Sequence, residues 1–121
     1  MGQNCIGIER FIIHRSLHDE FISIMSERIK KLRLGSVLAP SDPPEAGYVS
    51  VVDNGSMISD ARFAELERLC QSAVKDGADL VCGGKRWRHA YLEDGAYFEP
   101  TLIGNARNEM EVVQNEGKSL V

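Results

Sequence analysis

Residues 16–35 read SLHDEFISIMSERIKKLRLG, and this stretch constrains the fold of the chain more strongly than any other. Its apolar side chains recur every three or four residues, so that they line one side of an α-helix. These are Phe21, Ile22, Met25, Ile29 and Leu32. Ser16 followed by Asp19 resembles a capping box at a helix N-terminus, and Gly35 is a typical stop signal. We therefore predict an amphipathic helix from Ser16 to Gly35.

The segments on either side predict strands and one further helix. Before the helix, residues 10–14 read RFIIH, an apolar run rich in β-branched residues that is typical of a short buried strand. A second helix is predicted from residue 59 or 60 to Gly77, with an apolar side made of Phe63, Leu66, Leu69, Cys70, Ala73 and Val74. Residues 78–82 predict a strand, and residues 97–103 a weaker one, because Pro100 lacks a backbone donor.

This alternation of helices and strands predicts an α/β fold with an open, partly parallel sheet flanked by helices. The chain has 121 residues, which is enough for one domain and too few for two. Three or four short strands make a thin sheet, so we expect part of a domain rather than a complete one.

Composition and charge exclude several classes of protein. Hydrophobic residues make up 43% and charged residues 26%, which is ordinary globular usage. The net charge of −4 argues against a nucleic-acid binder, and the basic residues from Arg28 to Arg33 are spaced as on the solvated side of a helix. No run approaches the roughly 18 apolar residues of a membrane helix. The odd number of cysteines suits a reducing compartment, so we expect a cytoplasmic protein without a membrane segment.

Cys5 is the strongest candidate for chemistry, and it lies in the sequence GQNCIG, residues 2–7. If a helical turn starts there, its free N–H groups stabilise a thiolate, which is the form that attacks a carbonyl carbon. Composition alone leaves a second interpretation open, a small buried hydrophobic residue near the N-terminus.

Other motifs give weaker signals. The histidines at 14, 18 and 89 do not combine with the cysteines at a standard zinc spacing, so no metal site is predicted. Residues 83–86, GGKR, lack the glycine spacing and the hydroxyl residue of a phosphate-binding loop and predict a tight turn. Cys70 and Cys82 lie in apolar stretches, which is typical of core thiols.

The sequence GQNCIGIE, residues 2–9, resembles the second half of the catalytic-cysteine motif of the aldehyde dehydrogenase family, Gly-Gln-x-Cys followed by small or aliphatic residues. Further landmarks occur in the order of that family and extend the resemblance over residues 2–116. They are the helix that ends at Gly35, residues 53–59, the helix that ends at Gly77-Ala78, Gly83-Gly84, Tyr97–Leu102 and Met110–Glu116. Residues 4–11 are most similar to a fungal and plant branch, some of whose members carry a membrane anchor.

The resemblance implies a partial aldehyde dehydrogenase catalytic domain over residues 1–116 and a divergent tail over residues 117–121. In the family a cysteine attacks the aldehyde, hydride passes to NAD or NADP, and water releases a carboxylate from the thioester. Cys5 would be that nucleophile, and its own N–H would form half of the oxyanion hole. Glu116 matches the glutamate that binds the nicotinamide-side ribose. The implied partner is an aldehyde substrate.

The resemblance also implies machinery outside this segment. The family has a general-base glutamate, an oxyanion-hole asparagine and a cofactor domain before the cysteine, and Phe-Gly-Pro after the residue that matches Glu116, where this chain reads GKSLV. We therefore expect the chain to be inactive alone and to bind neither NAD nor NADP by itself. We interpret the tail as read-through of an unspliced intron and Met1 as an internal start. The alternative to an enzyme part is a non-catalytic fragment or interaction protein.

Overall fold

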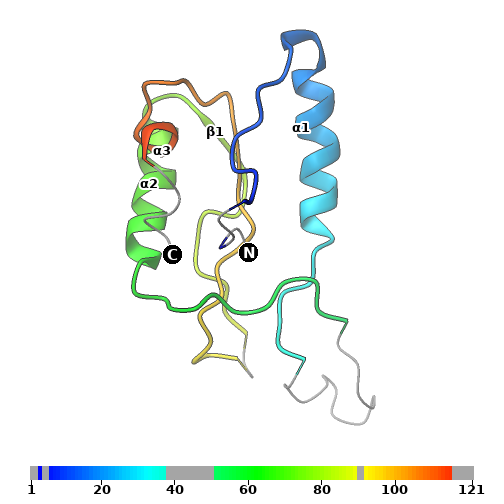
Figure 1. The fold of residues 1–121 in the computed structure, drawn as a ribbon, viewed down its shortest axis with the longest axis vertical. Helices are drawn as coiled ribbons and strands as arrows, with labels where there is room; N and C mark the ends of the chain where they lie inside the picture. Colours follow the sequence, from blue (N-terminus) through cyan, green and yellow to red (C-terminus); the bar gives the residue numbers. More distant parts are fainter. Residues whose placement is uncertain (1–2, 4–5, 38–50, 90–91, 116–121) are drawn as a thin grey trace.

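The computed structural model describes residues 3, 6–37, 51–89 and 92–115. Its elements follow in the order α1 (Arg15–Lys30), α2 (Phe63–Lys75), β1 (Asp79–Cys82), β2 (Leu102–Gly104) and α3 (Glu111–Gln114). The strands lie between α1 on one side and α2 with α3 on the other (Figure 1). The predicted α/β fold, with helices flanking a small sheet, is confirmed.

The regular sheet has two antiparallel strands. β1 and β2 pair Asp79 with Gly104, Leu80 with Ile103 and Cys82 with Leu102, with an irregularity between Leu80 and Cys82. Two antiparallel strands can be joined by a chain that simply reverses direction, whereas two parallel strands need a crossover connection. Parallel pairing within the described ranges is limited to the isolated bridge between Leu34 and Asn54.

The N-terminal end of α1 lies one residue before the predicted start and uses a different cap. His14 is the N-cap, and its Nδ1 accepts a hydrogen bond from the backbone N–H of Ser16 at 3.3 Å. Ser16 therefore lies inside the helix, with its hydroxyl 2.8 Å from the same ring nitrogen. The capping box of Ser16 with Asp19 was a wrong prediction, because the imidazole supplies the acceptor that a capping serine would provide.

The C-terminal end of α1 lies at Lys30, not at Gly35. The carbonyl of Arg33 accepts hydrogen bonds from the N–H groups of Asp53 and Asn54, at 2.9 and 3.1 Å. The N–H of Gly35 donates in turn to the carbonyl of Asn54 at 3.1 Å. These bonds to a distant segment take the place of helical ones, so the helix ends before the glycine.

The predicted apolar side of α1 faces the sheet. Its residues Phe21, Ile22, Met25 and Ile29 are half-buried, whereas the basic residues Arg28, Lys30, Lys31 and Arg33 are exposed. The side chain of Ile22 lies against Gly104 of β2. The basic cluster is thus solvated, as predicted, and the amphipathic pattern is confirmed as far as Ile29.

Residues 10–14 are neither a strand nor buried, so this prediction was wrong. The segment is irregular, Ile12 is fully exposed and Phe11 is 53% exposed, in contact with Phe21 at 5.6 Å between ring centroids. A strand needs a neighbour to receive its hydrogen bonds. None of the described strands pairs with residues 10–14.

Helix α2 buries the side that its periodicity predicts, except that Val74 is exposed. It begins at Phe63 rather than at residue 59 or 60, because the hydroxyl of Ser59 accepts from the N–H of Ala61 and forms a turn before the helix. The helix ends where Gly77 takes a φ of 93°. The N–H groups of Gly77 and Ala78 then donate to carbonyls of the last turn, as in a Schellman motif.

Two small cores lie at the two ends of α2. One joins Met57, Phe63 and Phe98, and the other joins Ala73, Ala78 and Met110. The core around Phe63 packs the start of α2 against Met57, which precedes the helix, and against Phe98, which follows β1. The second fixes its end to the residues that lead into α3.

Candidate functional site

Both residues that the sequence assigns to the site, Cys5 and Glu116, lie outside the described residues. The structure does describe the residues that flank them. Gln3 and Ile6 lie on either side of Cys5 within the cysteine motif, and Asn115 directly precedes Glu116. The anchoring of these flanks shows how the chain holds the two segments that carry the predicted chemistry.

The cysteine motif is tied to the first core. The side-chain Oε1 of Gln3 accepts a hydrogen bond from the N–H of Ile58 at 3.0 Å. The adjacent Met57 is buried, and its N–H donates to the carbonyl of Ala96 at 2.7 Å. One residue of the motif is therefore attached to a segment that itself packs against the start of α2.

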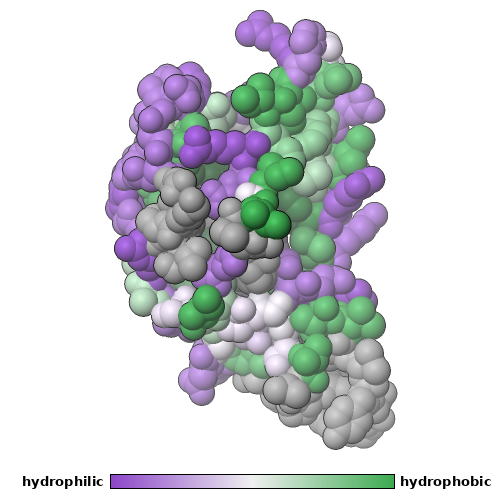
Figure 2. Space-filling view, in the orientation of Figure 1, coloured by the Kyte–Doolittle hydropathy of each residue, from purple (hydrophilic) through white to green (hydrophobic). Residues whose placement is uncertain are grey.

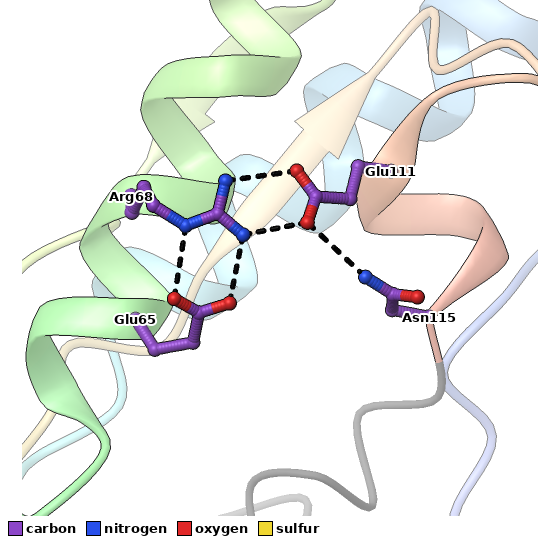
Figure 3. A network of polar contacts seen from close by, with 4 residues as sticks. All are labelled: Glu65, Arg68, Glu111 and Asn115. Carbon is purple, nitrogen blue, oxygen red and sulfur yellow. Dashed lines mark hydrogen bonds and ion pairs between the residues drawn. The ribbon is translucent and has the colours of Figure 1, made fainter.

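The segment that leads into Glu116 is tied to α2 by a polar network (Figure 3). The guanidinium of Arg68 donates from Nε and Nη2 to the carboxylate of Glu65, at 2.9 and 2.7 Å. It donates from Nη1 and Nη2 to the carboxylate of Glu111, at 2.9 and 2.6 Å. The side-chain amide of Asn115 donates to the same Glu111 at 3.3 Å.

The charges in this network stabilise one another. The hydrogen bonds from Arg68 lower the pKa values of Glu65 and Glu111, and they raise the pKa of Arg68 itself. Glu65 has the opposite, smaller effect on the pKa of Glu111, because the two carboxylates repel each other. The arginine thus keeps two like charges together at the junction of α2 and α3.

Apolar packing and a second arginine complete the junction. Met110, at the N-cap of α3, is only 2% exposed and packs in the second core with Ala73 and Ala78. Arg107 donates from Nη2 to the carbonyl of Asp76 at 2.8 Å, which satisfies a carbonyl at the end of α2.

Of the other two cysteines, Cys70 is buried as predicted of a core thiol, whereas Cys82 is not. Cys70 is buried in α2, and Cys82 is half-buried in β1. Burial, with a smaller contribution from the charge of Glu67, raises the pKa of the Cys70 thiol. Cys70 is therefore a poor nucleophile, since the thiolate is the reactive form. No group of three potential metal ligands occurs in the parts of the chain that the structure describes.

Gly83 and Gly84 do not form the predicted tight turn, because the antiparallel pairing of Cys82 with Leu102 continues beyond them as the bridge between Arg86 and Phe98. Both have positive φ, at 75° and 84°. A Cβ at Gly83 would overlap the carbonyl oxygen of Pro100 and the side chain of Thr101, and one at Gly84 would meet Leu80.

Sequence reasoning missed the network around Arg68. The spacing of Glu65 and Arg68, three residues apart on a helix, predicts an ion pair between them. The partner that matters for the site is Glu111, which lies 43 residues further along the chain. Only the packing of α3 on α2 brings the two together.

The described elements form part of a layered α/β domain. The model of the aldehyde dehydrogenase family matches residues 1–117, and the chain belongs to that family. The expected similarity to fungal members is confirmed: an aldehyde dehydrogenase-like protein of Saccharomyces cerevisiae is 43% identical over 117 residues, covering 95% of this chain and 17% of that protein. A second such protein, from Schizosaccharomyces pombe, is 44% identical over 115 residues, covering 95% and 20%.

Solved structures give the same result for the fold. Betaine aldehyde dehydrogenase from Staphylococcus aureus, solved in complex with NAD+, matches with a TM-score of 0.77 and 32% identity, over 95% of this chain and 21% of that one. The chain spans about a fifth of the length of these relatives. In the described ranges, no helix is both long and apolar enough to cross a membrane.

Proposed function

We propose that this chain is the cysteine-bearing part of an NAD- or NADP-dependent aldehyde dehydrogenase that acts within a longer polypeptide. Residues 1–116 would belong to the catalytic domain and residues 117–121 would be a divergent tail. The observation that carries the proposal is the family match, which runs through both the cysteine motif and Glu116. The cytoplasm is the proposed location, supported by the odd number of cysteines.

In the proposed reaction, the thiolate of Cys5 attacks the aldehyde carbon. A carbon–sulfur bond forms, and the carbonyl π electrons move to oxygen, where the N–H of Cys5 stabilises the negative charge. NAD(P)+, when bound, would supply the acceptor for the hydride, the hydrogen that leaves with both electrons of its C–H bond, and its loss would leave a thioester to Cys5. Water then breaks the carbon–sulfur bond, which releases the carboxylate, a proton and the thiol of Cys5.

The proposed contribution of this chain to the cofactor is a single carboxylate. The side chain of Glu116 would accept hydrogen bonds from the hydroxyls of the nicotinamide-side ribose. A carboxylate is an acceptor-only group, which suits a diol donor. Because residues 83–86 lack the spacing of a phosphate-binding loop, the pyrophosphate contacts would come from the rest of the polypeptide.

A hybrid protein tests this proposal. Residues 1–116 replace the matching segment of the Staphylococcus aureus enzyme, which supplies the cofactor domain, and formation of NADH from betaine aldehyde is followed by absorbance. We expect activity in the hybrid, none in C5A, and full activity in the control C82A. The isolated chain should form no NADH. A hybrid whose activity survives C5A would refute the role of Cys5, and the same replacement in the Saccharomyces cerevisiae relative provides a second host.

A second candidate function, a non-catalytic chain that binds other polypeptides, is favoured by the exposed apolar surface. Figure 2 shows apolar side chains gathered over the N-terminal segment and α1, where Ile6, Ile8, Phe11, Ile12 and Leu17 are exposed. Such a patch is uncommon on a monomer. Sedimentation of the isolated chain decides this: a concentration-independent monomer would contradict the candidate, and association that I12D abolishes would support it.

A further inference from the structure

Arg68 has no role in the reaction proposed above, yet it makes four hydrogen bonds at the junction of α2 and α3. We propose, on the basis of that function, that Arg68 is a positioning residue for cofactor binding. It fixes α3 to α2 and thereby fixes the peptide that leads into Glu116.

First, the guanidinium binds both carboxylates in a forked manner. Four hydrogen bonds of 2.6 to 2.9 Å leave from three nitrogens, two bonds to Glu65 and two to Glu111. The planar fork of arginine fixes orientation as well as distance, which the single ammonium of lysine cannot do for two carboxylates at once.

Second, α3 depends on contacts from outside itself. It has only four residues, which is far below the length at which an isolated helix is stable in water. Buried Met110 holds its N-terminal end. The side chain of Glu111 is the polar attachment to α2, and without Arg68 it would face the like charge of Glu65.

Third, the network reaches the residue next to Glu116. The backbone N–H of Asn115 donates to the carbonyl of Glu111 at 2.9 Å, and its side-chain amide donates to the carboxylate of the same residue at 3.3 Å. The order of attachment is therefore Arg68, Glu111, Asn115, and then Glu116 as the next residue of the chain.

The direct test is hydrogen exchange of α3, which needs no cofactor. The amides of Val113, Gln114 and Asn115 donate to carbonyls within or just before α3, so they report its opening. In both the isolated chain and the hybrid, we expect R68K and R68M to speed their exchange by at least about threefold. The matched control is R33K, since Arg33 also binds a carboxylate through two nitrogens but at the far end of α1.

The functional test is NAD+ binding to the hybrid, measured by calorimetry and by steady-state kinetics. Loosening one charge-assisted contact should raise the Kd and the KM for NAD+ roughly three- to tenfold in R68K and R68M, with a smaller change in kcat. R33K should leave both constants unchanged. The double variant R68E/E111R restores opposite charges across the junction and should recover at least half of the lost affinity.

The outcomes separate the inference from the function on which it rests. If E116Q weakens NAD+ binding while R68K and R68M leave α3 exchange and the Kd unchanged, the role of Arg68 is refuted and that of Glu116 stands. If E116Q binds NAD+ as tightly as the unmodified hybrid, the cofactor role fails at Glu116 itself, whatever the exchange rates show. Faster exchange and weaker binding, both reversed in R68E/E111R, support the positioning role.

Discussion

Substitution of three glycines by alanine separates backbone strain from steric overlap. Gly83 has a φ of 75°, and an added Cβ would overlap Pro100 and Thr101. Gly77 has a φ of 93°, but its added Cβ would meet only the end of the Arg107 side chain, at 3.5 Å. Gly55 has open space around the added atom.

The expected losses of stability follow from these surroundings. The left-handed conformation costs an alanine about 1–2 kcal/mol, and this is the whole expected cost of G77A. Overpacking adds about 1–3 kcal/mol, so G83A should lose about 2–5 kcal/mol of unfolding free energy. G55A should be neutral or stabilising by up to about 1 kcal/mol, because it restricts the unfolded chain.

Urea unfolding followed by tryptophan fluorescence measures the series. The single tryptophan, Trp87, lies three residues after Gly84, with its ring 5.4 Å from that of Tyr97. The midpoints should fall in the order G55A, G77A, G83A, with similar slopes. If G83A and G77A lose the same unfolding free energy, the overlap with Pro100 and Thr101 does not destabilise the fold, and the reasoning is refuted.

Three further predictions concern the core, the acid range and the thiols. M110A should lose about 2–5 kcal/mol of unfolding free energy, because the side chain is buried against α2, and the same measurement on V74A, at an exposed position, should show a change near zero. The guanidinium of Arg33 lowers the pKa of Asp53 to about 2, so this pair stabilises the fold above the ordinary carboxyl pKa near 4 and loses its effect as the pH falls toward 2. As the pH is lowered across that range, the urea midpoint should therefore decrease less in D53N than in the unmodified chain. An equal decrease in both would contradict the pairing. Because burial raises the pKa of Cys70, iodoacetamide should modify it at least about tenfold more slowly in the native chain than in urea, and peptide mass spectrometry that found equal rates would show that the site is open.

Much of the fold could be predicted from the sequence, because the decisive signals are local. The apolar periodicity of α2, the glycine at its end and the strand that follows are all properties of short windows, and they are confirmed. The cap of α1 was missed although its signal is also local, since histidine is an uncommon N-cap. Its early end was missed because Arg33 pairs with Asp53, twenty residues away.

The wrong prediction at residues 10–14 has a different cause. An apolar, β-branched run predicts a strand only if a neighbouring strand is available to it. The described residues supply none, and Ile12 stays fully exposed. For the candidate site, the family resemblance predicts Cys5 and Glu116 from short motifs. The contact of Arg68 with Glu111 spans 43 residues and cannot be predicted from a motif.

Helix α2 connects the two segments that carry the proposed chemistry. Near its start, Phe63 packs with Met57, whose neighbour Ile58 donates its N–H to Gln3 of the cysteine motif. Further along, Arg68 and the second core hold α3, which leads into Glu116. A nucleophile and a cofactor contact must be held at a fixed separation for hydride transfer to compete with other reactions of the bound aldehyde. The described contacts attach Gln3 near the start of α2 and Glu111 to Arg68 within it, so we expect substitutions at the junction of α2 and α3 to affect the proposed cofactor binding without altering the attachment of Gln3.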